Sequence, residues 1–239
     1  MKKYIPNTIT LCNLLSGGAG FVFRHRSNIE MALAMMLLAA VFDFFDGMVA
    51  RALGVSSELG KELDSLSDCV SFGVLPSLML LHFGISNCVY NPIFCYTALL
   101  IAAFSALRLG MFNIDKRQSS SFIGLATPAS GILIASFCVF LGTKAGWGSL
   151  VFIATHAWTI PAISILICFL LVAEIPMFSM KFSKTTDKRT MVQRWVLLTC
   201  VVATISVCIV MKFHYSFLIL VTFICYILIN LLSLCFIKK

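Results

Sequence analysis

The sequence predicts an all-α, polytopic integral membrane protein, a bundle of about eight transmembrane helices with the N- and C-termini in the cytoplasm. Hydrophobic residues make up 60% of the 239 residues and charged residues only 12%, unlike the composition of a soluble domain. The apolar residues are gathered in runs of roughly 20, the length that a helix needs to cross a bilayer. Helix is required there because unpaired backbone groups are not tolerated in lipid.

Eight apolar runs follow one another along the chain, separated by short polar stretches. The first contains a patch of small residues, which is typical of close helix packing. The second and third meet at a group of aspartates, and polar turns precede the fifth and the sixth. The most polar stretch, residues 181–194, is predicted to be a basic loop before the last two spans. The predicted spans are 9–23, 29–53, 60–82, 92–113, 122–141, 150–170, 195–211 and 217–237.

The distribution of basic residues predicts which way the bundle faces. With the N-terminus inside, 14 of the 18 lysines and arginines fall on the cytoplasmic side and 4 on the outside. Such a bias favours cytoplasmic termini and a cytoplasmic position for the aspartates. We expect one membrane-embedded domain over residues 1–239, with a core over about 1–172 and two extra spans over about 195–237.

Four aspartates stand at the adjoining ends of the second and third spans. Asp43 and Asp46 are three residues apart, and Asp64 and Asp68 are four apart, so each pair shares one face of its helix. Acids within membrane spans are costly and need a compensating partner. Two acidic faces brought together would form an all-oxygen cluster, which suits Mg²⁺ or Mn²⁺.

The residues between the acids fit a site for a phosphate-bearing ligand. Gly47 and Ala50 leave room for a bulky group, and Arg51 offers a planar fork for a phosphate. Gly60 is expected to open the next helix, where free N–H groups favour an anion. Taken singly, small residues in membrane helices are more often packing contacts, and an arginine at a helix end is more often an anchor.

The whole stretch reads Asp-x-x-Asp-Gly-x-x-Ala-Arg, eight residues, then Gly-x-x-x-Asp-x-x-x-Asp. It resembles the signature of the CDP-alcohol phosphotransferase family at every fixed position. The family consists of integral-membrane enzymes that bind two divalent ions, transfer a phosphatidyl-type group from a CDP-linked donor to an alcohol, and release CMP. The matching residues are Asp43, Asp46, Gly47, Ala50, Arg51, Gly60, Asp64 and Asp68.

The resemblance implies roles for the acids and their neighbours. Asp43, Asp46 and Asp64 would be ligands shared between two Mg²⁺ or Mn²⁺ ions, and Asp68 would serve the second metal and act as general base. The nucleotide pocket would be formed by Gly47, Ala50, Arg51 and Gly60. Asn13 of the first span is a weaker candidate for the nucleotide, since a lone asparagine in a span more often bonds another helix.

The resemblance also implies partners and a location. We expect a homodimer in the cell (inner) membrane, multi-pass, with its active site facing the cytoplasm, because CDP-linked donors and CMP are cytoplasmic metabolites. The lipid bilayer is the expected partner, and no nucleic acid is expected.

Two further stretches bear on which alcohol is the acceptor, Ala106–Asn113 and Phe122–Ala129. They resemble the phosphatidylserine synthase branch of the family, although Ala126 stands where that branch usually has proline. CDP-diacylglycerol and L-serine would then be the substrates and phosphatidylserine the product. Arg108 could pair with the serine carboxylate, with Asn113 beside it. An arginine at this interface can also be only an anchor.

Other functions remain open from the sequence. The same chemistry could use glycerol 3-phosphate or an inositol phosphate as acceptor. A cation transporter would also place acids in spans, but transporters tend to have paired halves, and no second copy of the acidic stretch is visible. A membrane prenyltransferase would need two widely separated acidic clusters, and nothing after Asp115 repeats the pattern.

Overall fold

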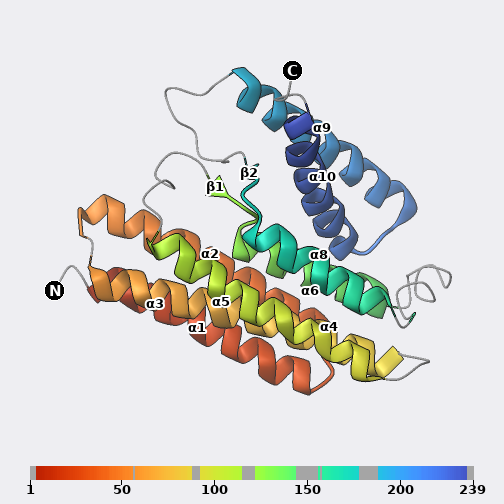
Figure 1. Ribbon diagram of the computed structural model, residues 1–239, viewed down its shortest axis with the longest axis horizontal. Coiled ribbons are helices and arrows are strands. Elements are labelled where there is room, and N and C mark those ends of the chain that lie inside the picture. Colours follow the sequence, from red (N-terminus) through yellow and green to blue (C-terminus); the bar gives the residue numbers. More distant parts are fainter. Residues whose placement is uncertain are drawn as a thin grey trace.

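The computed structural model describes residues 4–55, 57–87, 92–114, 122–143, 156, 158–177 and 188–235. Within them the chain is almost entirely helical, and the helices lie side by side as a bundle (Figure 1). A short π-helix (η1) joins α3 to α4, and a 3₁₀ helix (η2) leads into α5. The elements are α1 (Tyr4–His25), α2 (Ile29–Leu53), α3 (Glu58–Asp68), η1 (Cys69–Val74), α4 (Leu75–Asn87), η2 (Pro92–Ala98), α5 (Leu99–Ile114), β1 (Phe122–Ile123), α6 (Thr127–Gly142), α8 (Thr159–Val172), β2 (Pro176–Met177), α9 (Lys188–Met211) and α10 (Tyr215–Cys235).

Each predicted span contains a helix, and the all-α membrane class is confirmed. In the described part of the chain, five helical segments are long and apolar enough to cross a membrane, and α6 and α8 are shorter apolar helices. Large apolar side chains such as Leu15, Phe169 and Val210 are exposed on the helix surfaces, where lipid would cover them. The number of spans and the sides on which the termini lie stay predictions.

Two predicted boundaries are wrong. The basic stretch 181–194 is not a loop throughout, since α9 begins at Lys188 and includes Arg194. Lysine, arginine and glutamine are good helix formers, so a helix can extend beyond its apolar part into water. The fifth span does not begin at Phe122, because Phe122 and Ile123 pair with β2 as a two-residue strand. Residues 150–155 of the sixth span and 181–187 of the basic stretch lie outside the described residues.

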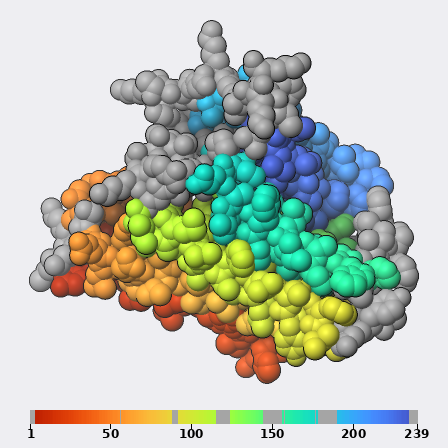
Figure 2. Space-filling view, in the orientation of Figure 1, coloured from red at the N-terminus to blue at the C-terminus, as the bar shows by residue number. Residues whose placement is uncertain are grey.

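The helices form an N-terminal group and a C-terminal pair. In the first group, α1 packs on α2, α3 and η1, while α6 packs on α2, α4 and η1. The pair α9 and α10 joins this group through α10, which packs on α6. Figure 2 shows the two groups on opposite sides of one face, the N-terminal helices in red to yellow and the C-terminal pair in blue.

Glycines let the π-helix η1 lie close to its neighbours. A Cβ on Gly17 of α1 would lie 2.9 Å from the Cα of Ser71, and one on Gly131 of α6 would lie 2.6 Å from the backbone oxygen of Phe72. Any side chain at either position would push the helices apart. The small-residue patch of the first span therefore has a packing role here, as its composition predicted.

We predict opposite effects for two neighbouring substitutions on α1. Gly17→Ala should destabilise the fold by about 1–3 kcal/mol, because the added methyl group overpacks the contact with Ser71. Gly18→Ala is the matched control, since a Cβ there meets nothing within 4 Å and alanine favours helix. Thermal unfolding in detergent measures both. Equal unfolding temperatures for the two variants would contradict the close contact.

A short, firmly capped connection joins α2 to α3. Gly54, with φ +62°, ends α2 in the left-handed conformation, and the N–H of Val55 donates to the carbonyl of Ala50 at 3.0 Å. Ser57 then caps α3 by accepting from the N–H of Gly60. The acidic ends of the two helices are thereby held next to each other.

Candidate active site

Three of the four motif aspartates meet between α2 and α3. Carboxylate oxygens of Asp43, Asp64 and Asp68 all lie within 4.8 Å of one another. Asp43 comes from the last turns of α2, and the other two lie one helical turn apart on α3. Three carboxylates so close repel one another unless a cation or protons compensate the charge.

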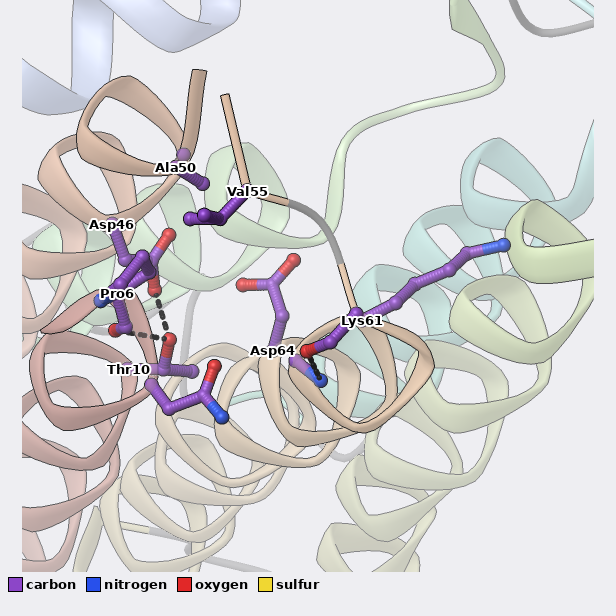
Figure 3. A pocket seen from close by; sticks show the side chains of 11 residues that line it. Pro6, Thr10, Asp46, Ala50, Val55, Lys61 and Asp64 are labelled. Carbon is purple, nitrogen blue, oxygen red and sulfur yellow. Dashed lines mark hydrogen bonds between the residues drawn. The ribbon is translucent and has the colours of Figure 1, made fainter. Parts of the chain in front are cut away.

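Asp46 is placed beside this group but is not one of the three. Its side chain is buried, and its Oδ2 accepts a hydrogen bond of 2.7 Å from the hydroxyl of Thr10 on α1 (Figure 3). The same hydroxyl oxygen lies 3.1 Å from the carbonyl oxygen of Pro6 one turn earlier, so its single proton is shared between the two acceptors. The hydroxyl therefore fixes one oxygen of Asp46, and the backbone N–H of Gly47 also donates to this carboxylate.

Asp68 is the most deeply placed acid of the three. Its Oδ1 accepts a 3.1 Å hydrogen bond from the amide of Asn13, which is fully buried. Ser67 and Ser71 bond the backbone of α1 on either side of this contact. Asn13, predicted for the nucleotide, is thus placed as a partner of Asp68, and it does not line the cavity described next.

A cavity of about 240 Å³ opens between the start of α1, the end of α2 and the start of α3. Asp46 and Asp64 stand in its wall, and Figure 3 shows the Asp64 carboxylate facing its interior. Asp64 therefore belongs to both the acidic cluster and the cavity. The other lining residues are Pro6, Asn7, Thr10, Gly47, Ala50, Val55, Ser57, Gly60 and Lys61.

Four of the five residues predicted for the nucleotide lie at this cavity or beside it, and the fifth, Asn13, does not. Gly47, Ala50 and Gly60 line it. Arg51 is exposed. It lies next to the cavity, since a Cβ on the lining residue Gly47 would be 3.5 Å from one guanidinium nitrogen of Arg51. Lys61 turns its ammonium group away from the cavity, and its Nζ donates to the carbonyl of Asn113 at 2.8 Å.

The expectation that Gly60 opens α3 with a free N–H is wrong. The helix begins at Glu58, and the Gly60 N–H already donates to the Ser57 hydroxyl at 3.0 Å. A serine one residue before a helix competes for the N–H groups that an anion would use. Gly60 instead provides space, since a Cβ there would lie 3.0 Å from Oδ1 of Asn7.

Arg108 and Asn113, predicted for the acceptor, are held by different elements. Arg108 of α5 is buried, with 7% of the residue's surface exposed, and its Nη1 donates to the hydroxyl of Thr127 at 3.2 Å. Its Nε is buried and has no hydrogen-bond partner among the described residues. The guanidinium interacts electrostatically with Asp68. Asn113 instead donates to Ser65 of α3 at 2.9 Å.

The stretch before α6 delivers Thr127 to Arg108. Gly124 has a φ of +77° and donates to the carbonyl of Ile175, and Leu125 donates to Leu170, so the turn is tied to the end of α8. A side chain on Gly124 would also meet the carbonyl of Leu171 at 2.8 Å. Glycine is needed here for both reasons.

Sequence reasoning missed several residues around the site. Thr10 and Thr127 each lie in a stretch that the sequence singles out, yet nothing in their type or spacing marks their partners. Tyr226 of α10 interacts electrostatically with Arg108, and no motif in the sequence marks it. Because α10 lies outside the motif region, only the packing of α10 on α6 could show this contact.

The donor atoms of the acidic cluster show whether it could bind a divalent cation. The three aspartates offer carboxylate oxygens, the ligands that hard cations prefer. Oδ1 of Asp64 and Oδ1 of Asn13 are buried without a hydrogen-bond partner in the described part of the chain. Buried acceptors are rarely left in that state. The residues therefore fit a divalent cation.

Comparison with known proteins places this geometry in a family. The model of the CDP-alcohol phosphatidyltransferase family matches residues 3–237. The chain belongs to that family. CDP-alcohol phosphatidyltransferases depend on divalent cations, in keeping with the acidic cluster. Membership argues against the cation-transporter and prenyltransferase alternatives.

Proteins similar to this chain come from bacteria and archaea. A CDP-diacylglycerol–serine O-phosphatidyltransferase of Bacillus subtilis (strain 168) is 37% identical over 137 residues, 56% of this chain and 76% of that protein. One of Helicobacter pylori (strain J99) is 34% identical over 141 residues, 58% of each chain. The archaetidylserine synthase of Methanothermobacter thermautotrophicus is 33% identical over 139 residues, 56% of this chain and 57% of that protein. The last two matches cover less than two thirds of those proteins.

Proposed function

We propose that this protein transfers a phosphatidyl group from CDP-diacylglycerol to the hydroxyl of L-serine, releasing CMP and forming phosphatidylserine. The observation that carries the proposal is the position of the buried Arg108, which interacts with Asp68 of the acidic cluster. A buried cation beside the catalytic acids suits an acceptor that has a carboxylate as well as a hydroxyl.

The names of the relatives support serine as the acceptor. The bacterial relatives are named for serine with a CDP-diacylglycerol donor, and the archaeal relative is named for archaetidylserine. The names agree on serine and differ in the lipid. Serine is therefore the part of the reaction that all three names share.

We propose that Asp43, Asp46, Asp64 and Asp68 hold two divalent cations, Mg²⁺ or Mn²⁺. Asp43, Asp64 and Asp68 converge already, and Asp46 keeps one oxygen outside its bond to Thr10. Bound cations would neutralise the diphosphate of the donor and stabilise the leaving oxygen of CMP.

Asp68 is proposed as the general base. In this role it takes the proton of the serine hydroxyl while that oxygen attacks the β-phosphorus, the one that carries the lipid, and the bond from this phosphorus to the CMP oxygen breaks. Asn13 orients the carboxylate by donating to its Oδ1, leaving the second oxygen for the proton. Arg108 holds the serine carboxylate and so sets the position of the hydroxyl.

The cavity at the start of α3 is proposed as the nucleotide pocket. Gly47, Ala50 and Gly60 leave it open, and Arg51 stands at its edge within reach of a phosphate. Asn7 and Ser57 supply polar groups for the base or ribose. Asn13 has no direct part in nucleotide binding in this proposal.

The protein is proposed to lie in the cell membrane with its active site and both termini on the cytoplasmic side, as a homodimer. Glu58, at the start of α3, should then face the cytoplasm. Arg26, which follows the C-terminal end of α1, should face the outside. In a variant without native cysteines, an impermeant thiol reagent added to intact cells should label Arg26→Cys and not Glu58→Cys. Opening the cells should expose Glu58→Cys. Labelling of Glu58→Cys in intact cells would refute the orientation.

The activity is tested by CMP release from CDP-diacylglycerol in detergent. We expect release that requires L-serine and Mg²⁺ or Mn²⁺, and that stops when EDTA is added. Glycerol 3-phosphate and inositol phosphate serve as alternative acceptors. Release with glycerol 3-phosphate and not with serine would refute the acceptor while leaving the reaction type intact.

A further inference from the structure

A second cavity, of about 440 Å³, lies where the last turn of α1 faces the last turns of α4. Figure 1 shows α1 and α4 running to the same end of the bundle, away from the start of α3. Thr10 lines the candidate active site and Arg24 lines this cavity, and the 14 helical steps from one to the other correspond to roughly 21 Å of helix. The two sites are therefore separate.

The cavity combines an apolar wall with basic side chains. The apolar part consists of one phenylalanine from α1 and three aliphatic residues from α4, and the basic part consists of one arginine and two histidines. Both kinds of side chain point to the same ligand only if the ligand has an anionic end and an apolar end. The lining residues are Phe21, Arg24, His25, Leu78, Leu81, His82 and Ile85.

The basic groups face one another without an acid among the described residues. Arg24, His25 and His82 interact electrostatically, and the interaction is repulsive. No carboxylate of the described chain forms an ion pair with any of them. Nε of Arg24 is buried and lacks a hydrogen-bond partner in the same part of the chain. A buried donor on a permanently charged group is costly to leave unpaired.

We propose that this cavity binds an anionic phospholipid, whose phosphate lies on Arg24, His25 and His82 and whose acyl chain lies on Leu78, Leu81 and Ile85. Arg24 supplies the charge and a planar set of donors, and an imidazole N–H can donate to a phosphate oxygen in either protonation state. Basic pockets between membrane helices suit anionic head groups. The helix ends put the cavity at the level of the head groups, on the membrane face opposite the candidate active site.

Native mass spectrometry of the full-length protein in detergent tests the proposal, with dioleoylphosphatidylglycerol as probe and dioleoylphosphatidylcholine as the zwitterionic control. Wild type should retain one molecule of phosphatidylglycerol with higher affinity than phosphatidylcholine. Arg24→Gln should weaken retention of phosphatidylglycerol about tenfold or more, the loss expected for one charge-assisted hydrogen bond. His82→Gln should weaken retention of phosphatidylglycerol several-fold. Because His82 is exposed, this variant should fold normally and keeps the test valid if Arg24→Gln misfolds.

Arg26→Gln is the matched control, because Arg26 is exposed in the turn beside Arg24 and does not line the cavity. It should bind phosphatidylglycerol as wild type does. Equal loss in Arg24→Gln and Arg26→Gln, with none in His82→Gln, would reduce the site to general attraction by basic residues and overturn the proposal. So would equal retention of the two lipids. Displacement of the lipid by millimolar inorganic phosphate would identify a site for a free anion and would also overturn it.

Discussion

Asp64→Asn should lower CMP release roughly a thousandfold while the protein still folds and inserts. Asp64 is the one acid in both the three-carboxylate cluster and the wall of the cavity. A bound cation stabilises transition-state charge by several kcal/mol, and each 1.36 kcal/mol is about a factor of ten in rate. Losing one ligand between the cluster and the substrate should remove most of that stabilisation.

The measurement pairs CMP release with Mn²⁺ binding followed by electron paramagnetic resonance. Asp64→Asn should weaken Mn²⁺ binding and activity together. Glu62→Gln is the control, since Glu62 is an exposed acid on the same helix outside the cluster and the cavity. If Asp64→Asn keeps substantial activity, the metal assignment fails. If Glu62→Gln loses as much activity, the effect belongs to the charge of α3 and not to the cluster.

Arg108→Gln should raise the KM for serine tenfold or more and leave the KM for the CDP-lipid largely unchanged. A hydrogen bond between charged groups contributes about 1.5–3 kcal/mol, and each ~1.4 kcal/mol is tenfold in affinity. The guanidinium is buried, so no water can replace it easily at a bound carboxylate. Its Nε has no partner in the described structure and is ready to receive one.

Arg51→Gln supplies the converse experiment. Arg51 lies at the nucleotide side of the site, so its loss should raise the KM for the CDP-lipid and not that for serine. The two variants are titrated with both substrates, and unfolding temperatures are measured because Arg108 also bonds Thr127. A response of Arg108→Gln to the donor alone would assign Arg108 to the donor phosphates or to the fold.

The sequence predicted the helices well because apolar runs in a membrane have few alternatives to helix. The second span, 29–53, coincides with α2, whose ends are marked by Asn28 and Gly54 as caps. Where the chain leaves the lipid this constraint disappears. Both wrongly predicted boundaries lie in such regions: α9 begins at Lys188, within the predicted loop, and Phe122 belongs to a short strand. Polar residues are compatible with helix, strand and loop, so periodicity does not decide among them.

For the candidate site, spacing predicted shared faces and could not predict partners across helices. The four-residue interval correctly placed Asp64 and Asp68 on one face of α3, where Asp43 of α2 meets them. That Thr10 bonds Asp46, or that Asn13 bonds Asp68, depends on how α1 rotates against α2 and α3. The same limit applies to Arg108 and Thr127, whose contact follows from a left-handed turn at Gly124.

The π-helical turn Cys69–Val74 has a consequence for how one long helix can serve two surroundings. A π-turn accommodates one more residue than an α-helical turn, so the side chains after it are rotated by about 100° relative to an unbroken α-helix. Upstream, the helix directs Asp64 and Asp68 towards the cluster, and downstream it buries Leu75 and Met79. The extra residue therefore rotates the apolar face of α4 about the helix axis relative to the acidic face of α3. Deleting one residue here would restore a continuous α-helix. Either the acids would then turn away from the cluster or the apolar face would turn away from the core.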